Sequence, residues 1–156
     1  MIGFANHYRA QVWIAFQWFD PNCQGGSEPF RTEGWFNFQP GDSSWLNISE
    51  LADLRRVGST HFYYYVEAAD GAVWAGPYVT NCPSSAFNWC NYQNDPSTRA
   101  PGFREIIISN TPDYSINLIP GDLQPTIQVS TEKNQEGGWV TVTGNGYASV
   151  GRLHLC

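Results

Sequence analysis

Aromatic residues beside glycine are the side chains of this sequence whose type and spacing best suit binding chemistry. Trp35 follows Glu33 and Gly34, and Trp74 stands two residues before Gly76. Because glycine has no Cβ, an indole ring can lie flat over the backbone there and present its face to a sugar or a proline-rich peptide. We therefore predict that Glu33, Trp35 and Trp74 contribute to a ligand site, with burial of either tryptophan in the core as the alternative.

A second candidate surface lies in the tyrosine-rich segment of residues 61–69. In an extended strand, Tyr63 and Tyr65 point to the same side as His61 and Glu67. Tyrosine hydroxyls form directional hydrogen bonds at a low cost in side-chain entropy, so this polar-tipped face is a candidate for ligand binding. A purely structural role for the two tyrosines is the alternative.

No pattern in the sequence carries the chemistry of an enzyme. The sequence holds no Gly-x-Ser-x-Gly turn for an activated serine, and no local pair of carboxylates suited to glycoside hydrolysis. It also holds no Cys-x-x-Cys pair and no aspartate-rich loop, the usual signatures of zinc and calcium sites. We expect a non-catalytic protein with no cofactor and no metal.

The four cysteines allow three pairings into two disulfides. Cys82 and Cys90 flank a short loop that a disulfide can close, and we predict this pair first, which leaves Cys23 and Cys156 as the second. A composition rich in Trp, Asn and Gly with almost no Lys is typical of secreted binding proteins. Residues 1–6 lack the basic and apolar regions of a signal peptide, so either the protein is intracellular or Met1 replaces a leader that is removed. We expect a secreted or periplasmic location, which requires such a leader.

Charge and hydropathy exclude two classes of partner. The net charge is −6 and Lys133 is the single lysine, whereas binding to a phosphate backbone needs several cations on one surface. No apolar run approaches the roughly 20 residues of a membrane-spanning helix. We therefore expect no nucleic-acid partner and no membrane span.

The composition predicts an all-β fold. Aromatic residues make up 15% of the chain, and 15 Gly with 10 Pro indicate many turns between short elements. Period-two alternation and turn residues predict strands at residues 12–19, 31–39, 44–48, 61–69, 72–74, 103–109, 114–119, 126–132, 139–143 and 147–155. At most one short helix is expected, over residues 49–57 with Ser49 as its N-cap. An antiparallel β-sandwich accommodates such strands.

Two hairpins are predicted within this sandwich. Pro40 and Gly41 favour a turn that joins residues 31–39 to residues 44–48. Asp70-Gly71 is a strong hairpin signal between residues 61–69 and 72–74.

A series of short segments lies at residues 4–8, 12–15, 32–36, 39–41 and 62–68, and Cys82 followed by Phe87 comes after them. Their order and spacing resemble the DUF1036 family of small bacterial domains of unknown function. Ala5 stands where family members commonly have a cysteine, and Asp42 follows Pro40-Gly41 where a second cysteine is common, so the family's disulfide pattern does not transfer. The resemblance covers roughly residues 2–90 and implies a secreted or periplasmic β-domain with no established activity.

Together these observations predict a single β-sandwich domain over residues 1–156, in which residues 91–156 add strands to the DUF1036-like part. A second small unit after Pro120-Gly121-Asp122 is the alternative arrangement. We expect a carbohydrate-binding module that uses exposed aromatic rings and loop amides. A protein-interaction module, such as a secreted effector, an inhibitor or an assembly component, is the alternative.

Overall fold

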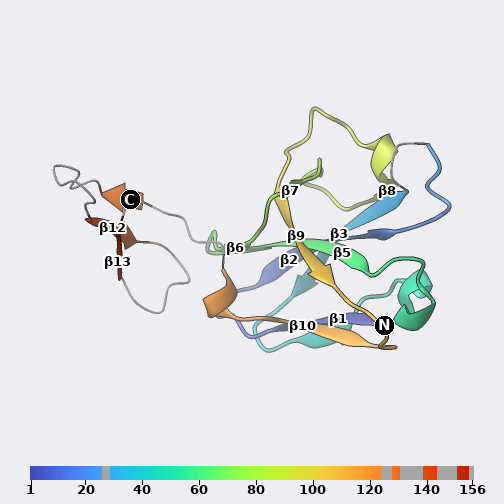
Figure 1. Cartoon of the computed structure of the whole chain (residues 1–156), viewed down its shortest axis with the longest axis horizontal. Helices are drawn as coiled ribbons and strands as arrows, with labels where there is room; N and C mark the ends of the chain where they lie inside the picture. Colours follow the sequence, from blue (N-terminus) through green and yellow to red (C-terminus); the bar gives the residue numbers. More distant parts are fainter. Residues whose placement is uncertain (26–28, 124–127, 131–138, 144–150, 155–156) are drawn as a thin grey trace.

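The computed structural model is an all-β protein in which two sheets face each other as layers (Figure 1). It describes residues 1–25, 29–123, 128–130, 139–143 and 151–154, the last three ranges through their backbone alone. Its described helical elements are short 3-10 turns: η1 (Ser49–Leu51), η2 (Leu54–Arg56), η3 (Asn91–Gln93) and η4 (Pro120–Asp122). The predicted all-β sandwich is therefore confirmed.

The larger layer is a seven-stranded sheet in the order β7-β9-β5-β2-β3-β8, with β6 paired to β5. Its strands are β2 (Val12–Phe19), β3 (Phe30–Phe38), β5 (His61–Ala68), β6 (Val73–Trp74), β7 (Tyr78–Val79), β8 (Phe87–Cys90) and β9 (Gly102–Ile107). Alternation in β2 sends Val12, Ile14 and Phe16 into the main core, whereas Ala15 packs on the opposite, outer face. The large sheet is therefore covered on both sides.

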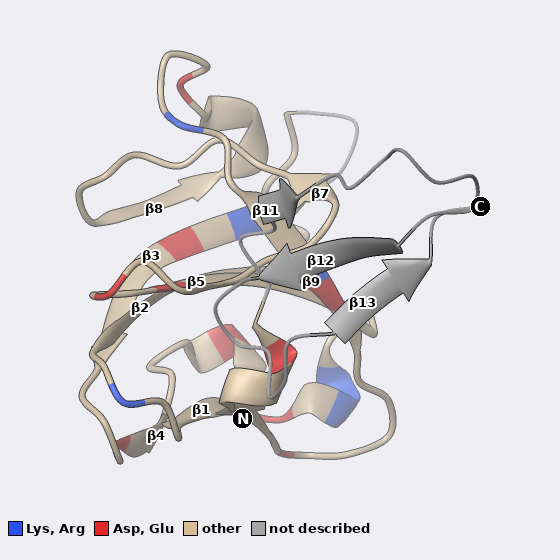
Figure 2. Cartoon of the chain, turned by 90° about the vertical axis from the view of Figure 1, so that its left-hand side faces the viewer, with Lys and Arg blue, Asp and Glu red and all other residues tan. Residues whose placement is uncertain are grey.

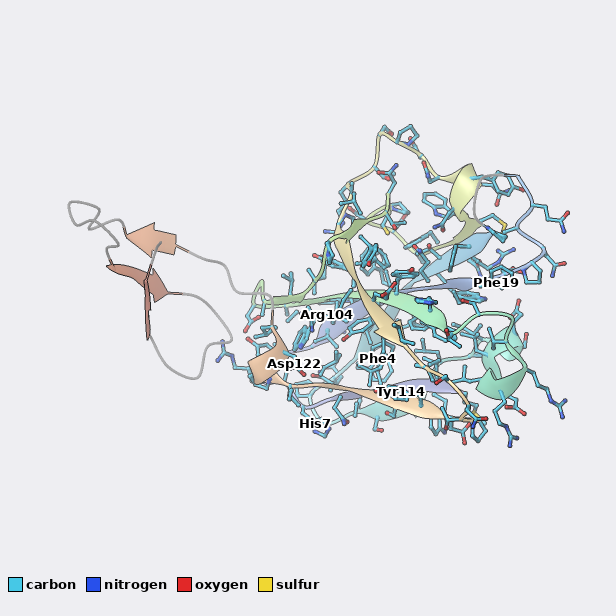
Figure 3. The ribbon with its side chains drawn as sticks, in the orientation of Figure 1. Phe4, His7, Phe19, Arg104, Tyr114 and Asp122 are labelled. Atoms are coloured by element: carbon cyan, nitrogen blue, oxygen red, sulfur yellow. A yellow bond between two sulfur atoms is a disulfide. The ribbon has the colours of Figure 1, made fainter. Side chains whose placement is uncertain are left out.

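The smaller layer contains β10 (Tyr114–Leu118), β1 (Ile2–Asn6) and β4 (Ser43–Trp45), in that order, below the large sheet in Figure 2. Phe4 of β1 lies between the two layers (Figure 3). Its ring meets the rings of Phe16 and Tyr64 edge to face, with centroids 6.1 and 5.6 Å apart. These aromatic contacts join the sheets, and each adds about 0.5–1.5 kcal/mol to the free energy gained from burying apolar area.

Two predictions of strand pairing need correction. Residues 31–39 and 44–48 do not form a hairpin, because β4 pairs antiparallel with β1 of the other layer. The sandwich is also not wholly antiparallel, since β1 and β10 run parallel. The hairpin of β5 and β6 is confirmed, with Gly71 at φ 92° in its turn.

The short helix predicted over residues 49–57 is replaced by the two turns η1 and η2. Ser49 does not cap η1, where Ile48 holds the N-cap position and no side chain caps the turn. Asp53 caps η2 instead, its carboxylate accepting a hydrogen bond from the Arg55 backbone N–H at 3.1 Å.

Part of residues 91–156 completes the two layers, because β9 pairs with β5 and β10 pairs with β1. The strands β11 (Gln128–Ser130), β12 (Trp139–Thr143) and β13 (Gly151–His154) form a three-stranded antiparallel sheet in the order β11-β12-β13. Each of these strands falls within or matches a predicted strand. The division into one or two domains stays a prediction.

Residues 75–101, called here the covering segment, contain β7 and β8 and run across the outer side of the large sheet (Figure 1). The segment contributes Cys82 and Phe87 to a second apolar cluster, in which they pack with Tyr65 and Phe103 of the sheet. These apolar contacts hold the covering segment against the outer face of the sheet.

Candidate functional site

An open depression of about 420 Å³ lies on the outer face of the large sheet, at the margin of the covering segment. Two half-buried indole rings border it, Trp13 from β2 and Trp35 from β3. Its other lining residues are Asn37, Glu67, Ser84 and Ala86. A concave surface that combines aromatic rings with a few polar groups is typical of small-molecule sites, so this depression, the Trp13–Trp35 pocket, is the candidate site.

A β-bulge turns Trp35 toward the pocket. The pairing of β2 with β3 changes register, so that Gly34 and Trp35 together lie opposite Ala15. In a regular strand Trp35 would share a face with Glu33, two positions before it. With the extra residue, Glu33 lies opposite the core residue Phe16, and Trp35 packs on the outer face.

Arg99 of the covering segment contacts two of the residues that line the pocket, Trp35 and Glu67. Its guanidinium carbon lies 4.9 Å from the centre of the Trp35 ring and 5.9 Å from that of Tyr65. Its Nη2 donates to Glu67 Oε2 at 2.8 Å, and the Tyr65 hydroxyl donates to the same oxygen at 3.1 Å. The cation thus joins the covering segment to both aromatic rings and to the carboxylate.

Two ionisable groups close to this ion pair, the Tyr65 hydroxyl and the Cys82 thiol, have raised pKa values. Burial, with the negative charge of Glu67 and the hydrogen bond to it, raises the pKa of Tyr65 to about 12. Burial likewise raises the pKa of the Cys82 thiol to about 12. Both groups therefore stay protonated at neutral pH, and the charges at this side of the pocket belong to Arg99 and Glu67.

Several polar groups in the pocket remain available to a ligand. Within the described part of the chain, the side chains of Trp13, Asn37 and Ser84 form no hydrogen bond. Both hydrogen bonds to Glu67 use Oε2, which leaves Oε1 as a further acceptor. Trp35 differs, since its Nε1 donates to the Pro83 carbonyl at 3.0 Å and only its ring is offered.

The residues predicted to bind a ligand do not all meet here. Trp35 lines the pocket, and Tyr65 lies beside it, buried at 8% exposure among Trp35 and Phe103. Glu33 lies on the other face of the sheet. Burial raises the pKa of the Glu33 carboxyl, even though Asn88 lies within hydrogen-bond range.

Tyr63 belongs to a different part of the outer face. Its hydroxyl donates to Glu105 Oε2 at 3.0 Å, and His61 Nδ1 lies 3.3 Å from the same oxygen. The rings of Tyr63 and Tyr78 are 5.2 Å apart. His61, Tyr63 and Tyr65 therefore share one face of β5, as predicted, but they have different partners. His61 and Tyr63 contact Glu105, whereas Tyr65 contacts Glu67.

The prediction that Trp74 presents its ring to a ligand is wrong. Its side chain has 0% exposure, and its ring meets that of Tyr8 edge to face at 5.2 Å. Its Nε1 donates to the Ile119 carbonyl at 3.1 Å. Trp74 lies in β6, where the pairing with β5 turns the indole into the main core.

Sequence reasoning missed most of the pocket. Trp13 could have been found, because the alternation in residues 12–19 places it opposite the core face. Asn37 and Ser84 carry no comparable signal, because Asn37 follows the bulge in β3 and Ser84 lies in the covering segment. The contact of Arg99 with Trp35 is likewise made from the covering segment.

The predicted disulfide pairing is also wrong. Cys90 is bonded to Cys23, 67 residues away, and Cys82 is a buried free thiol. Cys82 and Cys90 stand in different places because β8 pairs with β3, which carries Cys90 toward the loop after β2. Because Cys23 is bonded to Cys90, the expected bond between Cys23 and Cys156 does not form. Cys156 itself lies outside the described residues.

The described residues contain neither a candidate metal site nor a candidate membrane-spanning helix. No group of three or more His, Cys, Asp or Glu side chains there could hold a metal ion. None of the described helices has the length and apolar character needed to cross a membrane.

Comparisons with known family models, curated proteins and solved structures gave no match to this chain. The resemblance to the DUF1036 family stays a prediction from the residues quoted above.

Proposed function

We propose that this protein is a non-catalytic carbohydrate-binding module and that the Trp13–Trp35 pocket is its site. One observation carries the proposal: two partly exposed indole rings border a depression in which the Ser84 hydroxyl and the Asn37 amide form no hydrogen bond with the described residues. The Glu67 carboxylate, paired through Oε2, keeps Oε1 as a further acceptor. A ligand for such a surface needs an apolar face and several hydrogen-bonding groups. A pyranose ring has both.

The charge of the pocket favours neutral sugars. The carboxylate of Glu67 lines the pocket, and the nearest cation, Arg99, is already paired with it. Glu67 Oε1 and Asn37 can accept hydrogen bonds from sugar hydroxyls, whereas an acidic sugar would bring a second carboxylate toward Glu67. The net charge of −6 acts in the same direction.

Affinity electrophoresis and calorimetry with neutral polysaccharides and their fragments test the proposal. The panel would contain glucan, xylan, mannan, galactan and chitin fragments. We expect one class to bind, and Trp13→Ala to weaken that binding at least about tenfold because a ring contact is lost. Tyr92→Ala is the control, since it removes an exposed aromatic ring that lies outside the pocket. If no member of the panel binds the parent chain, the proposal fails.

The disulfide bears on where the protein works. Disulfides persist in oxidising compartments and are rare in the cytosol, so the bond between Cys23 and Cys90 supports a secreted or periplasmic location. A fusion to alkaline phosphatase, which is active only after export, tests this location.

A protein-interaction module is the second candidate, supported by the edge of the large sheet. The edge strand β7 exposes Tyr78 by 45% and Val79 by 69%, and the neighbouring β9 exposes Ile107 by 61%. An exposed apolar edge strand can accept a strand from a partner. Cross-linking of parent and Val79→Glu proteins in an extracellular extract separates this candidate from the first, because the substitution leaves the sugar pocket intact.

A further inference from the structure

A second depression, of about 470 Å³, adjoins the Trp13–Trp35 pocket. Trp35 and Asn37 line both of them. The second depression continues from β3 down to β4 of the smaller layer, where Ser43 and Trp45 line it, and to Asn47 just after β4. The two depressions therefore meet at one stretch of β3 and together connect the outer face of the large sheet with the edge of the small one.

The two depressions adjoin along the part of β3 that lies beyond its pairing with β8. β8 pairs with β3 only from Arg31 to Gly34. Beyond Gly34, no described strand adjoins β3 on that side, and β4 is likewise the edge strand of its own sheet. On that side, residues 35–38 therefore pair with no described strand, and the exposed Asn37 lies between the two depressions.

Trp45 offers an aromatic surface at the far end of this path. Its side chain is 47% exposed, a large value for an indole in a small domain. Trp45 lies opposite Gly3 in β1, and a Cβ at Gly3 would come within 2.7 Å of the indole Cε3. Glycine at position 3 therefore lets the indole rest close against the small sheet while part of its surface stays open.

We infer that the ligand is a chain of several neutral sugar units, which extends from the Trp13–Trp35 pocket across β3 to Trp45. The inference rests on the proposed function and adds the length of the ligand to it. Trp13 and Trp35 hold the first units, Asn37 lies where the two depressions join, and Trp45 stacks on a later unit.

The side chains along the path favour a sugar chain over an extended peptide. In the described part of the chain, Asn37, Ser43 and Asn47 form no side-chain hydrogen bond. Free amides and hydroxyls between aromatic rings match the alternating hydroxyls and C–H faces of a polysaccharide. A peptide added to β3 would need main-chain pairing with residues 35–38 and pockets for alternate side chains.

Chain length is the variable that tests the inference. Calorimetric titrations would use the di-, tri- and hexasaccharides of the cellulose, xylan, mannan, β-1,3-glucan and chitin series, with the parent protein and with Trp45→Ala and Trp45→Phe. In the series that binds, we expect the hexasaccharide to bind at least about tenfold tighter than the trisaccharide. Trp45→Ala should abolish that gain while leaving trisaccharide affinity within about twofold, and Trp45→Phe should keep part of it.

The outcomes separate failure of the extended site from failure of the proposed function. Equal affinity for trisaccharide and hexasaccharide, or a gain that survives in Trp45→Ala, overturns the extended site but leaves the sugar pocket standing. No binding at any length in any series removes the proposed function and the extended site together. Binding of a peptide library that Trp45→Ala abolishes, without any sugar binding, assigns the same path to a protein strand. Thermal melts confirm that each variant is folded, and Tyr92→Ala serves as the matched loss of an exposed ring.

Discussion

Glu33 and Trp35 are two positions apart in β3, yet they lie on opposite faces of the large sheet. The bulge places Gly34 and Trp35 together opposite Ala15, so the alternation of side chains is interrupted between them. Trp35 reaches the pocket and the guanidinium of Arg99, while Glu33 lies opposite Phe16 on the core side. One inserted residue thus decides which of the two side chains can meet a ligand.

Substitution of Gly102 is expected to disrupt the attachment of the covering segment. A Cβ at Gly102 would lie 2.1 Å from the Gly76 carbonyl oxygen. Because that oxygen belongs to the backbone, the clash can be relieved only if the backbone moves. Gly102→Ala should lower the free energy of unfolding by more than about 3 kcal/mol, measured by denaturant titration. Gly121→Ala is the control, because no atom lies within 4 Å of its added Cβ. Similar stabilities for the two variants would contradict the close approach.

Removal of Arg99 should destabilise the chain more than removal of an exposed cation in a similar arrangement. Arg99 contacts two rings and Glu67, and its side chain is 40% exposed, so Arg99→Ala should cost about 1–2 kcal/mol of unfolding free energy. Arg9 also combines a ring contact with a carboxylate, but it is 73% exposed. Arg9→Ala should cost less than about 0.5 kcal/mol. Urea unfolding measures both variants. If Arg99→Ala and Arg9→Ala lower the free energy of unfolding equally, the greater burial of the Arg99–Glu67 pair adds nothing to stability.

Tyr65 should make the protein less stable in strong base. Below pH 10 its hydroxyl is protonated in the folded and the unfolded chain alike. Between pH 10 and about 12 the unfolded chain releases a proton that the folded chain keeps, so the free energy of unfolding falls as pH rises. Denaturant midpoints measured across this range should fall less steeply in Tyr65→Phe than in the parent. Identical slopes would place the pKa of Tyr65 near its ordinary value.

Loss of the disulfide should destabilise the fold strongly. Cys23 and Cys90 are 67 residues apart, and closing a loop of that size contributes about 4 kcal/mol through the reduced entropy of the unfolded chain. The double variant Cys23→Ser, Cys90→Ser should therefore show a lower guanidinium midpoint, and a reductant should lower the midpoint of the parent but not of the variant. A parent midpoint that does not respond to reductant, with reduction verified by mass spectrometry, would contradict this pairing.

Cys82 should be unreactive until the chain unfolds. Its side chain has 0% exposure, and burial raises its pKa to about 12, so the reactive thiolate is scarce at neutral pH. Iodoacetamide labelling followed by peptide mass spectrometry should modify Cys82 in denaturant and leave it unmodified in the native protein. Rapid native labelling of this peptide would show that the covering segment opens often.

Local sequence pattern predicted many of the strands and the faces of β2 and β5, but it did not predict β1, β7 or β8, nor the bulge in β3. In β2 and β5 the alternation of large apolar and polar-tipped residues has a period of two, which any short stretch displays by itself. The turn at Asp70-Gly71 is also local, since Gly71 takes the positive φ that this hairpin needs. From the same alternation the sequence also allowed Trp13 to be assigned to the outer face.

Tertiary structure alone decided which strands pair and which tryptophans are exposed. The pairing of β4 with β1 and of β1 with β10 joins segments far apart in the chain, and no local pattern records such contacts. Trp74 and Trp45 both belong to short strands, yet the first is buried by its pairing with β5 and the second is exposed on a sheet edge. Burial depends on what packs against a residue, and for these two side chains the neighbours come from remote parts of the chain.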